Sequence, residues 1–594
     1  MTVNPNIFTQ YFEKPQVSVF DRGKPVSFDL QIGQFVPAYW ELTGFGDNAK
    51  GRSGHKLRLA PMIAPNFANL RFQEHTIAVP LRTILPDFQE KFNYAKNLDG
   101  ATLPTISTLD LLRFYRYLGN CGVSPIGSLF DFLGYPVFAD FYDALVSVVN
   151  DTSYFRFSGT DAILGPFDPD TVILSHTIVP YRGLSFNVAE TERIYGFYTF
   201  CAINFLPGGQ AQFLRLGKPT GSDFVAACGD GYTMQSLTDA YLAYLFTSLL
   251  SATLLATYDP DSLFMEQEYS LLPLMAYHRA VADWNLNSTL SDTDKYISMY
   301  VHSLYSMLVN TGDYDEESVI SCAIPSSRLY DNDFFTSQLP TSAAGDAITI
   351  PANATVLDLA GLSALQKMML KLSYSSRFRD QIWNIFNIKV DDAWLQQSIV
   401  LRCKTHNVSI GETIQTSETS TSSVLGSFSG RGFSAGSNKG YHIFTQEPCV
   451  LINFVSLVAS PMYADALHPL IKVDNILDFP LPGMDVLGNQ PVRADMISGY
   501  PGDAAYVFGY SRQYMEWLHQ IPTVHGRMKT SLRYWNLVRR FHDTPMLNSS
   551  FVSMNPADDF DDLFSVQDSS HAFVDMYYDC KVTRPIHRSV RIVI

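Results

Sequence analysis

The chain has 594 residues, with 42 Lys and Arg against 58 Asp and Glu, and a net charge of −16 at pH 7. This charge argues against a protein whose whole surface binds nucleic acid by neutralising phosphates, but it does not exclude a local basic face. Charged residues make up only 17% of the chain and aromatic residues 13%. That combination fits extensive subunit contacts or a large buried core, and composition does not separate the two.

The chain is predicted to begin with an arm and then a β region over residues 25–82. Residues 1–24 carry Pro5 and Pro15 without a clear period, so we expect an extended N-terminal arm. Strands are then expected in three segments rich in β-branched and aromatic residues, namely 26–42, 55–62 and 70–81.

The middle of the chain is predicted to alternate between helix and short β segments. Ser107 and Thr108 can cap a helix that ends near Gly119. Between 151 and 230, short β-like runs are broken by Gly, Pro and Asp, which suggests a β-rich excursion. Helical patterns follow at 235–257, 270–286, 291–309 and 362–386.

One segment of the middle region is long enough to be considered as a membrane span. Residues 240–258 contain no charge, but Asp239 and Asp259 flank them without any Lys or Arg bias. A buried core or interface helix is the better interpretation.

The last third returns to β patterns. Sixteen of the twenty-six residues from 415 to 440 are Ser, Thr or Gly, a composition typical of a loop. Strand-like runs follow at 441–460 and 571–594. A β-sandwich split by long insertions fits this order, and so does a protein with separate β, α and β domains.

The segment GFSAG, residues 432–436, matches the G-x-S-x-G pattern of serine hydrolases. A nucleophile elbow requires a strand before the serine and a helix after it, whereas Ser434 follows a Ser- and Thr-rich run and precedes a strand pattern at Tyr441. We therefore expect Ser434 to be a loop residue without a catalytic role, with a serine hydrolase as the alternative. We expect no catalytic residue, no cofactor and no metal.

The cysteines and histidines carry no recognisable motif. The chain has seven cysteines at wide spacings without C-x-x-C, which predicts reduced thiols and no disulfide framework. Zinc patterns such as H-E-x-x-H are absent from the sequence, and His278 is interpreted as an ordinary helix histidine. The N-terminal residues show no secretory signal.

Residues 525–542 carry five cations and no acid. Aromatic side chains among cations suit single-stranded nucleic acid, because phosphates attract the charges and bases stack on the rings. The candidate contacts are Arg527, Lys529, Arg533, Tyr534 and Trp535. The alternative is that these cations form ordinary ion pairs with acids elsewhere, for instance in 555–564. The spacing of the residues alone favours this alternative.

Ordered stretches across residues 25–594 resemble the major capsid proteins of the Microviridae, closest to the gokushovirus-like branch. Among these stretches are LRLAPMIAPNF, HTIAVPLRTI, GSLFDFLGYPV, LLPLMAYHRAVADWN, GRGFSAGSNKGYHIFTQEPCVLINFVSLVAS, VFGYSRQYMEWLHQIP and WNLVRRFHDTPMLNSSFV. No single stretch is specific to this family, but the set of stretches in this order is.

The resemblance implies a mainly β protein, an eight-stranded viral jelly roll with long helical and irregular insertions. Its arm would be 1–24 and its single capsid domain 25–594, interrupted at 138–270 and 271–400 before the late strands of 401–594. It also implies a T=1 icosahedral homo-oligomer around circular single-stranded DNA, found in the virion, assembled in the bacterial cytoplasm, without a membrane span. A small basic DNA-binding protein, a minor pilot protein and a host receptor are possible partners.

This chain departs from the gokushovirus-like pattern in one place. The family's long threefold insertion follows a PLP…ITLP-like signature, where this chain is short, and the extra length lies between Val137 and Leu271. We expect residues 138–270 to form the surface protrusion.

Overall fold

The computed structural model describes eleven longer stretches and shorter pieces between them. The longer stretches are 17–85, 88–92, 103–107, 124–137, 268–286, 322–341, 378–390, 395–414, 428–481, 489–555 and 570–586. The chain divides into two compact units, one of residues 1–98, 275–302 and 325–594, and the other of residues 99–274 and 303–324. Each unit is described by itself.

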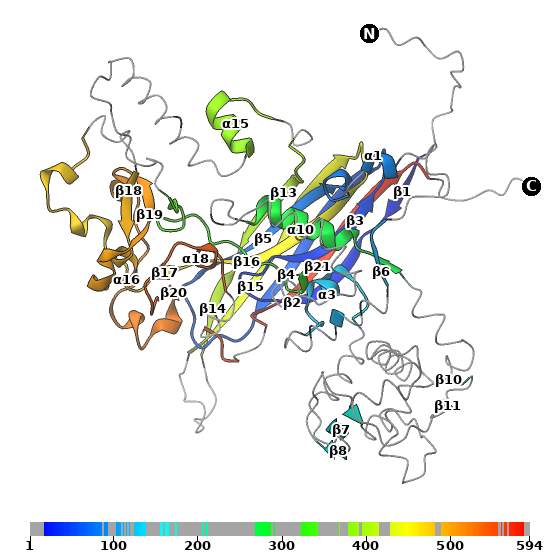
Figure 1. Cartoon of the computed structure of the whole chain (residues 1–594), viewed down its shortest axis with the longest axis horizontal. Coiled ribbons are helices and arrows are strands. Elements are labelled where there is room, and N and C mark those ends of the chain that lie inside the picture. Colours follow the sequence, from blue (N-terminus) through cyan, green and yellow to red (C-terminus); the bar gives the residue numbers. More distant parts are fainter. Residues whose placement is uncertain are drawn as a thin grey trace, which may run out of the picture. The chain divides into compact units, whose positions relative to one another are not determined.

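The first unit is built on two antiparallel sheets (Figure 1). The six-stranded sheet runs in the order β1 (Ser18–Asp21), β21 (Ala572–Arg584), β4 (Asn48–Leu59), β15 (Phe428–Phe444) and β14 (Ser409–Ile414), and β2 (Lys24–Leu30) also pairs with β21. The four-stranded sheet runs in the order β13 (Ile399–Asn407), β5 (Asn69–Pro80), β16 (Cys449–Ser460) and β3 (Val36–Thr43).

The pairing order of these sheets is that of a jelly roll. In chain order the eight main strands are β2, β3, β4, β5, β13, β15, β16 and β21. If these eight are numbered 1 to 8 in that order, one sheet has the order 1-8-3-6 and the other the order 2-7-4-5. Two interleaved Greek keys produce this order. Early and late strands share both sheets, so the expectation of a mainly β sandwich is confirmed and separate early and late β domains are excluded.

Burial along the strands shows how the sheets pack. Side chains of β4 and β21 alternate between buried and exposed, so one face of the six-stranded sheet packs inside the sandwich and the other is open. Strand β16 is buried almost throughout, because helix α10 (Leu272–Trp284) covers the other face of the four-stranded sheet. The Tyr277 hydroxyl donates to the Phe35 carbonyl at 2.8 Å, and its ring lies 5.6 Å from that of Phe454. The helix expected at 270–286 is confirmed.

A smaller apolar core lies beneath the late connections of the first unit. It joins Phe335, Tyr463, Phe508 and Phe551 to their neighbours. The elements around it are β17 (Met462–Tyr463), β18 (Asn489–Arg493), α16 (Asp495–Ser498), β19 (Val507–Arg512), α17 (Met515–Leu518), β20 (Val538–Arg539) and α18 (Ser549–Val552), with short 3-10 turns between them. Two further helices of this unit are α1 (Phe88–Lys91) and α15 (Phe378–Phe386).

The second unit contains only short described elements. Strands β6 (Thr105–Ser107) and β12 (Glu268–Ser270) pair, and α3 (Leu129–Leu133) lies between them in the chain. The β character expected at 151–230 is found in the strands described there: β7 (Phe155–Ser158), β8 (Asp161–Leu164), β9 (Ile173–Leu174), β10 (Phe205–Leu206) and β11 (Gln210–Ala211). The helices expected at 235–257 and 291–309 lie outside the described residues. No helix of the described part of the chain is long and apolar enough to cross a membrane.

Two local expectations need correction. The loop expected over 415–440 is wrong from residue 428 onward, because this Gly- and Ser-rich segment forms β15, which pairs with both β4 and β14. The expected arm is also shorter, because Ser18–Asp21 forms β1 against β21. In the first place pairing within the sheet overrides a composition that disfavours strands. In the second, pairing with β21 extends the sheet into the expected arm.

Candidate nucleic-acid surface and buried polar cluster

The G-x-S-x-G motif is a strand pattern. Residues 432, 434 and 436 alternate with exposed positions along β15, and Ser434 is 4% exposed inside the sandwich. A Cβ on Gly432 would stand 2.2 Å from Leu59 Cδ1, and one on Gly436 would stand 2.4 Å from His406 Nδ1. The two glycines are therefore explained by close packing within the sandwich.

Ser434 nevertheless has the neighbours of a hydrolytic serine. Its Oγ lies 3.3 Å from Nε2 of His55, and Nδ1 of His55 lies 3.3 Å from Oε1 of Glu74. The Ser434 hydroxyl also donates to the carbonyl of Asn407 at 3.1 Å. Serine, histidine and carboxylate thus stand in the order of a catalytic triad.

The surroundings of this triad-like arrangement do not suit catalysis. A nucleophile elbow holds its serine open to substrate at a strand-to-helix turn, whereas Ser434 lies inside a continuous strand and is buried between two sheets. The expectation that Ser434 is a loop residue is wrong, because it belongs to β15. Its hydrogen bonds to His55 and Asn407 indicate a structural polar network.

Glu74 and His406 complete this buried polar cluster, defined here as Ser53, His55, Glu74, His406, Ser434 and Asn438. Glu74 Oε2 accepts from Ser53 Oγ at 2.5 Å and from Asn438 Nδ2 at 3.3 Å. Burial by itself would raise the pKa of Glu74, but the His55 ring and these hydrogen bonds hold that pKa below its ordinary value. The ring of His406 lies 4.6 Å from that of His55. A buried carboxylate is thus kept ionised beside two imidazoles.

The open face of the six-stranded sheet carries a row of cations. Along β4 every exposed charged side chain is positive: Lys50, Arg52, Lys56 and Arg58. Within the described part of the chain, none of these four forms an ion pair. Acids Asp579 and Asp575 of β21 stand opposite Arg52 and Lys56 in the register.

Aromatic side chains flank this row. Phe573 of β21 and Phe433 of β15 stand opposite Arg58 on its two sides, and Tyr577 stands opposite Gly54. The three rings are exposed by 55%, 48% and 56%. We call these seven residues of β4, β21 and β15 the basic–aromatic face: Lys50, Arg52, Lys56, Arg58, Phe433, Phe573 and Tyr577. Its pattern of cations and open rings suits unpaired bases and phosphates.

Several cations of the stretch 525–542 already have partners within the protein. Lys529 and Arg540 both lie near the Asp465 carboxylate, at 4.0 and 3.6 Å. Arg539 is buried, donates to the Phe551 carbonyl at 2.8 Å and lies over the Phe551 ring. Ion pairing with an acid elsewhere thus accounts for part of this stretch, and the partner is Asp465.

The remaining residues of the stretch lie closer to solvent. Arg527 and Arg533 are exposed, while Tyr534 and Trp535 are half-buried. The Trp535 ring lies 5.7 Å from that of Phe67, which is 68% exposed. Nucleic-acid binding by Arg527, Lys529, Arg533, Tyr534 and Trp535 stays a prediction.

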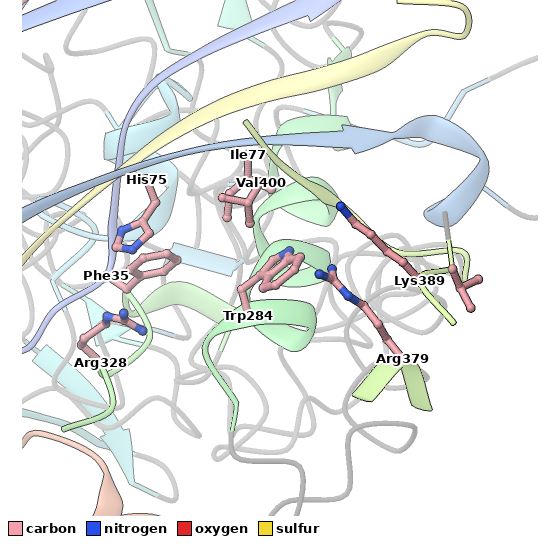
Figure 2. A pocket seen from close by; sticks show the side chains of 9 residues that line it. Phe35, His75, Ile77, Trp284, Arg328, Arg379, Lys389 and Val400 are labelled. Atoms are coloured by element: carbon pink, nitrogen blue, oxygen red, sulfur yellow. The ribbon is translucent and has the colours of Figure 1, made fainter. Parts of the chain in front are cut away.

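A pocket of about 800 Å³ forms a third basic feature, lined by Phe35, His75, Ile77, Trp284, Arg328, Arg379, Lys389, Val390 and Val400. Figure 2 shows Trp284 between two groups, with His75, Phe35 and Arg328 on one side and Arg379 and Lys389 on the other. Burial lowers the pKa of Arg328, whose guanidinium binds the side-chain oxygens of Asn285 and Gln73. Burial and the charge of Arg328 lower the pKa of His75 to about 4. The pocket is therefore electropositive and suits an anion.

The pairing order of the two sheets defines a β-sandwich of the jelly-roll type, an architecture that is common in viral shells. Residues 352–591 match the family described as capsid protein (F protein). The chain is also similar to the capsid protein VP1 of Chlamydia phage 1, with 25% identity over 252 residues. That match covers 40% of this chain and 41% of the relative, so the chain spans about two-fifths of the length of this curated relative.

Proposed function

We propose that the chain is a structural major capsid protein that assembles with copies of itself into a T=1 icosahedral shell around circular single-stranded DNA. The observation that carries the proposal is the extent of the family match, which includes β13, β15, β16 and β21. These are four of the eight jelly-roll strands and they contribute to both sheets. Short sheet edges and long free loops make this architecture suitable for subunit contacts.

We propose further that the basic–aromatic face contacts the DNA. Its four cations form no ion pair with any residue that the structure describes, and they lie along one strand, so they can follow a phosphate backbone while the flanking rings offer stacking surfaces. Such contacts are independent of sequence, as packaging of a whole genome requires. The face supplies local positive charge on a chain whose net charge is −16. The stretch 525–542 and the pocket around Arg328 are weaker candidates, because several of their cations already have partners within the protein.

The protein is proposed to act in the virion without catalysis. A small basic DNA-binding protein would neutralise the part of the genome that the shell does not contact, and a minor pilot protein would accompany it. The purified chain should form closed spherical particles in electron micrographs and elute with them in size-exclusion chromatography. A chain that stays monomeric with and without single-stranded DNA, and at every ionic strength tried, would contradict the capsid proposal.

A further inference from the structure

The hydrogen bonds around Ser434 determine which nitrogen of His55 carries a proton. The Ser434 hydroxyl has one hydrogen, and it donates that hydrogen to the Asn407 carbonyl. Toward His55 the hydroxyl must therefore accept, so Nε2 of His55 is protonated, and in the neutral tautomer that keeps this bond the Nδ1 lone pair is free to bind a cation. That lone pair faces Oε1 of Glu74 at 3.3 Å. Two lone pairs at this distance repel unless a cation lies between them.

Three residues suited to ligate a metal meet at this point, and each has a buried polar atom without a hydrogen-bond partner in the part of the chain that the structure describes. These atoms are His55 Nδ1, Glu74 Oε1 and His406 Nε2. The side chains of His55 and Glu74 are fully buried, and each of the three residues offers a ligand atom within 4.8 Å of the others. Buried polar atoms normally have partners, and a set of two imidazoles and a carboxylate gathered in one place is suited to hold a cation.

We propose that His55, Glu74 and His406 bind a divalent transition-metal ion of the zinc class. Imidazole and carboxylate are ligands that Zn²⁺ accepts, and neighbouring ligand atoms of a tetrahedral zinc site stand about 3.3 Å apart. The site has the outer contacts expected of a metal centre, because Ser434 orients the His55 ring while Ser53 and Asn438 hold the carboxylate.

The position of the site assigns the ion a structural role. His55 lies on β4 of the six-stranded sheet, whereas Glu74 and His406 lie on β5 and β13 of the four-stranded sheet. The ion therefore links the two layers of the sandwich. His406 is partly exposed and β13 is the edge strand of its sheet, so the ion has a route of entry. Binding to the folded state alone would stabilise the sandwich.

The test uses the full-length chain, stripped with a chelator and then titrated with Zn²⁺ or Co²⁺. The wild type should bind about one equivalent, gain the visible absorption of tetrahedral Co²⁺ and melt at a higher temperature with metal than without. The variant His406→Gln should lose the binding and the thermal shift. The matched control is His442→Gln, which changes an exposed histidine of β15 that contacts Asn48, and it should behave like the wild type.

Two results would overturn the proposal. The first is a wild type that binds neither ion and melts at the same temperature in metal and in chelator, in which case a protonated His55 paired with Glu74 fills the cluster. The second is a His406→Gln variant that folds, as judged by circular dichroism, and binds as much metal as the wild type. The wild-type titration needs no variant, so a misfolded variant does not leave the proposal undecided.

Discussion

His406 packs against Gly436 so closely that a Cβ on the glycine would stand 2.4 Å from the ring nitrogen Nδ1. The second glycine of a hydrolase-like motif thus makes room for an imidazole from the opposite sheet. Gly436→Ala should destabilise the folded chain by about 1–3 kcal/mol, because overpacking a tight interior forces side chains to shift. Denaturant unfolding measures this loss. Ala435→Ser, an exposed position on the same strand, should leave the midpoint unchanged, and equal effects of the two changes would contradict the assignment.

Ser434→Ala removes a hydroxyl that joins His55 Nε2 to the Asn407 carbonyl. The variant should lose about 1–3 kcal/mol of stability, because the buried His55 ring and the Asn407 carbonyl both lose a partner. Particle assembly and infectivity should remain largely intact. No fluorophosphonate labelling of Ser434 is expected in the wild type. An esterase activity that disappears in the variant would show that Ser434 is catalytic after all.

Charge reversal on the basic–aromatic face should weaken DNA binding. For the double variant Lys56→Glu with Arg58→Glu, we expect lower affinity for single-stranded DNA and a salt dependence reduced by about one unit of slope per cation removed. The comparison is Arg527→Glu with Lys529→Glu, which makes the same change of charge in the stretch 525–542. Filter binding at several salt concentrations separates the two surfaces. A larger loss of affinity in the second double variant would contradict this proposal and indicate that DNA binds at 525–542.

The thiols of the described cysteines should differ in reactivity. Cys403 is exposed, whereas Cys322, Cys449 and Cys580 are buried. Burial raises the pKa of the Cys449 thiol to about 11, against a weaker opposing hydrogen bond from Thr43, so little thiolate is present at pH 8. Maleimide treatment of the unassembled chain, followed by peptide mass spectrometry, should label Cys403 first among these four. Labelling of Cys449 at the same rate in the folded chain would be inconsistent with its burial.

The main strands could be predicted from the sequence because their side chains alternate or are rich in β-branched and aromatic residues. Strand β15 was missed because its glycines and serines are selected by contacts with Leu59 and His406 on other strands, which no local pattern reveals. The metal-ligand cluster was missed for a related reason. His55, Glu74 and His406 come from three strands and have no common spacing. The sequence shows that the cations of β4 lie at alternate positions, the period of a strand. Only the pairing of the strands shows that they share an open face with Phe433, Phe573 and Tyr577.

The most direct test of the account is an icosahedral reconstruction of the DNA-filled particle by cryo-electron microscopy. The reconstruction should show a T=1 shell of jelly rolls whose basic–aromatic face lies on the inner surface, in contact with DNA density. Residues 138–270 should lie on the outside as the surface protrusion, with their β-rich part at 151–230. A shell in which the open face of the six-stranded sheet points outward, with 151–230 against the genome, would contradict the proposed DNA contact and the proposed protrusion together.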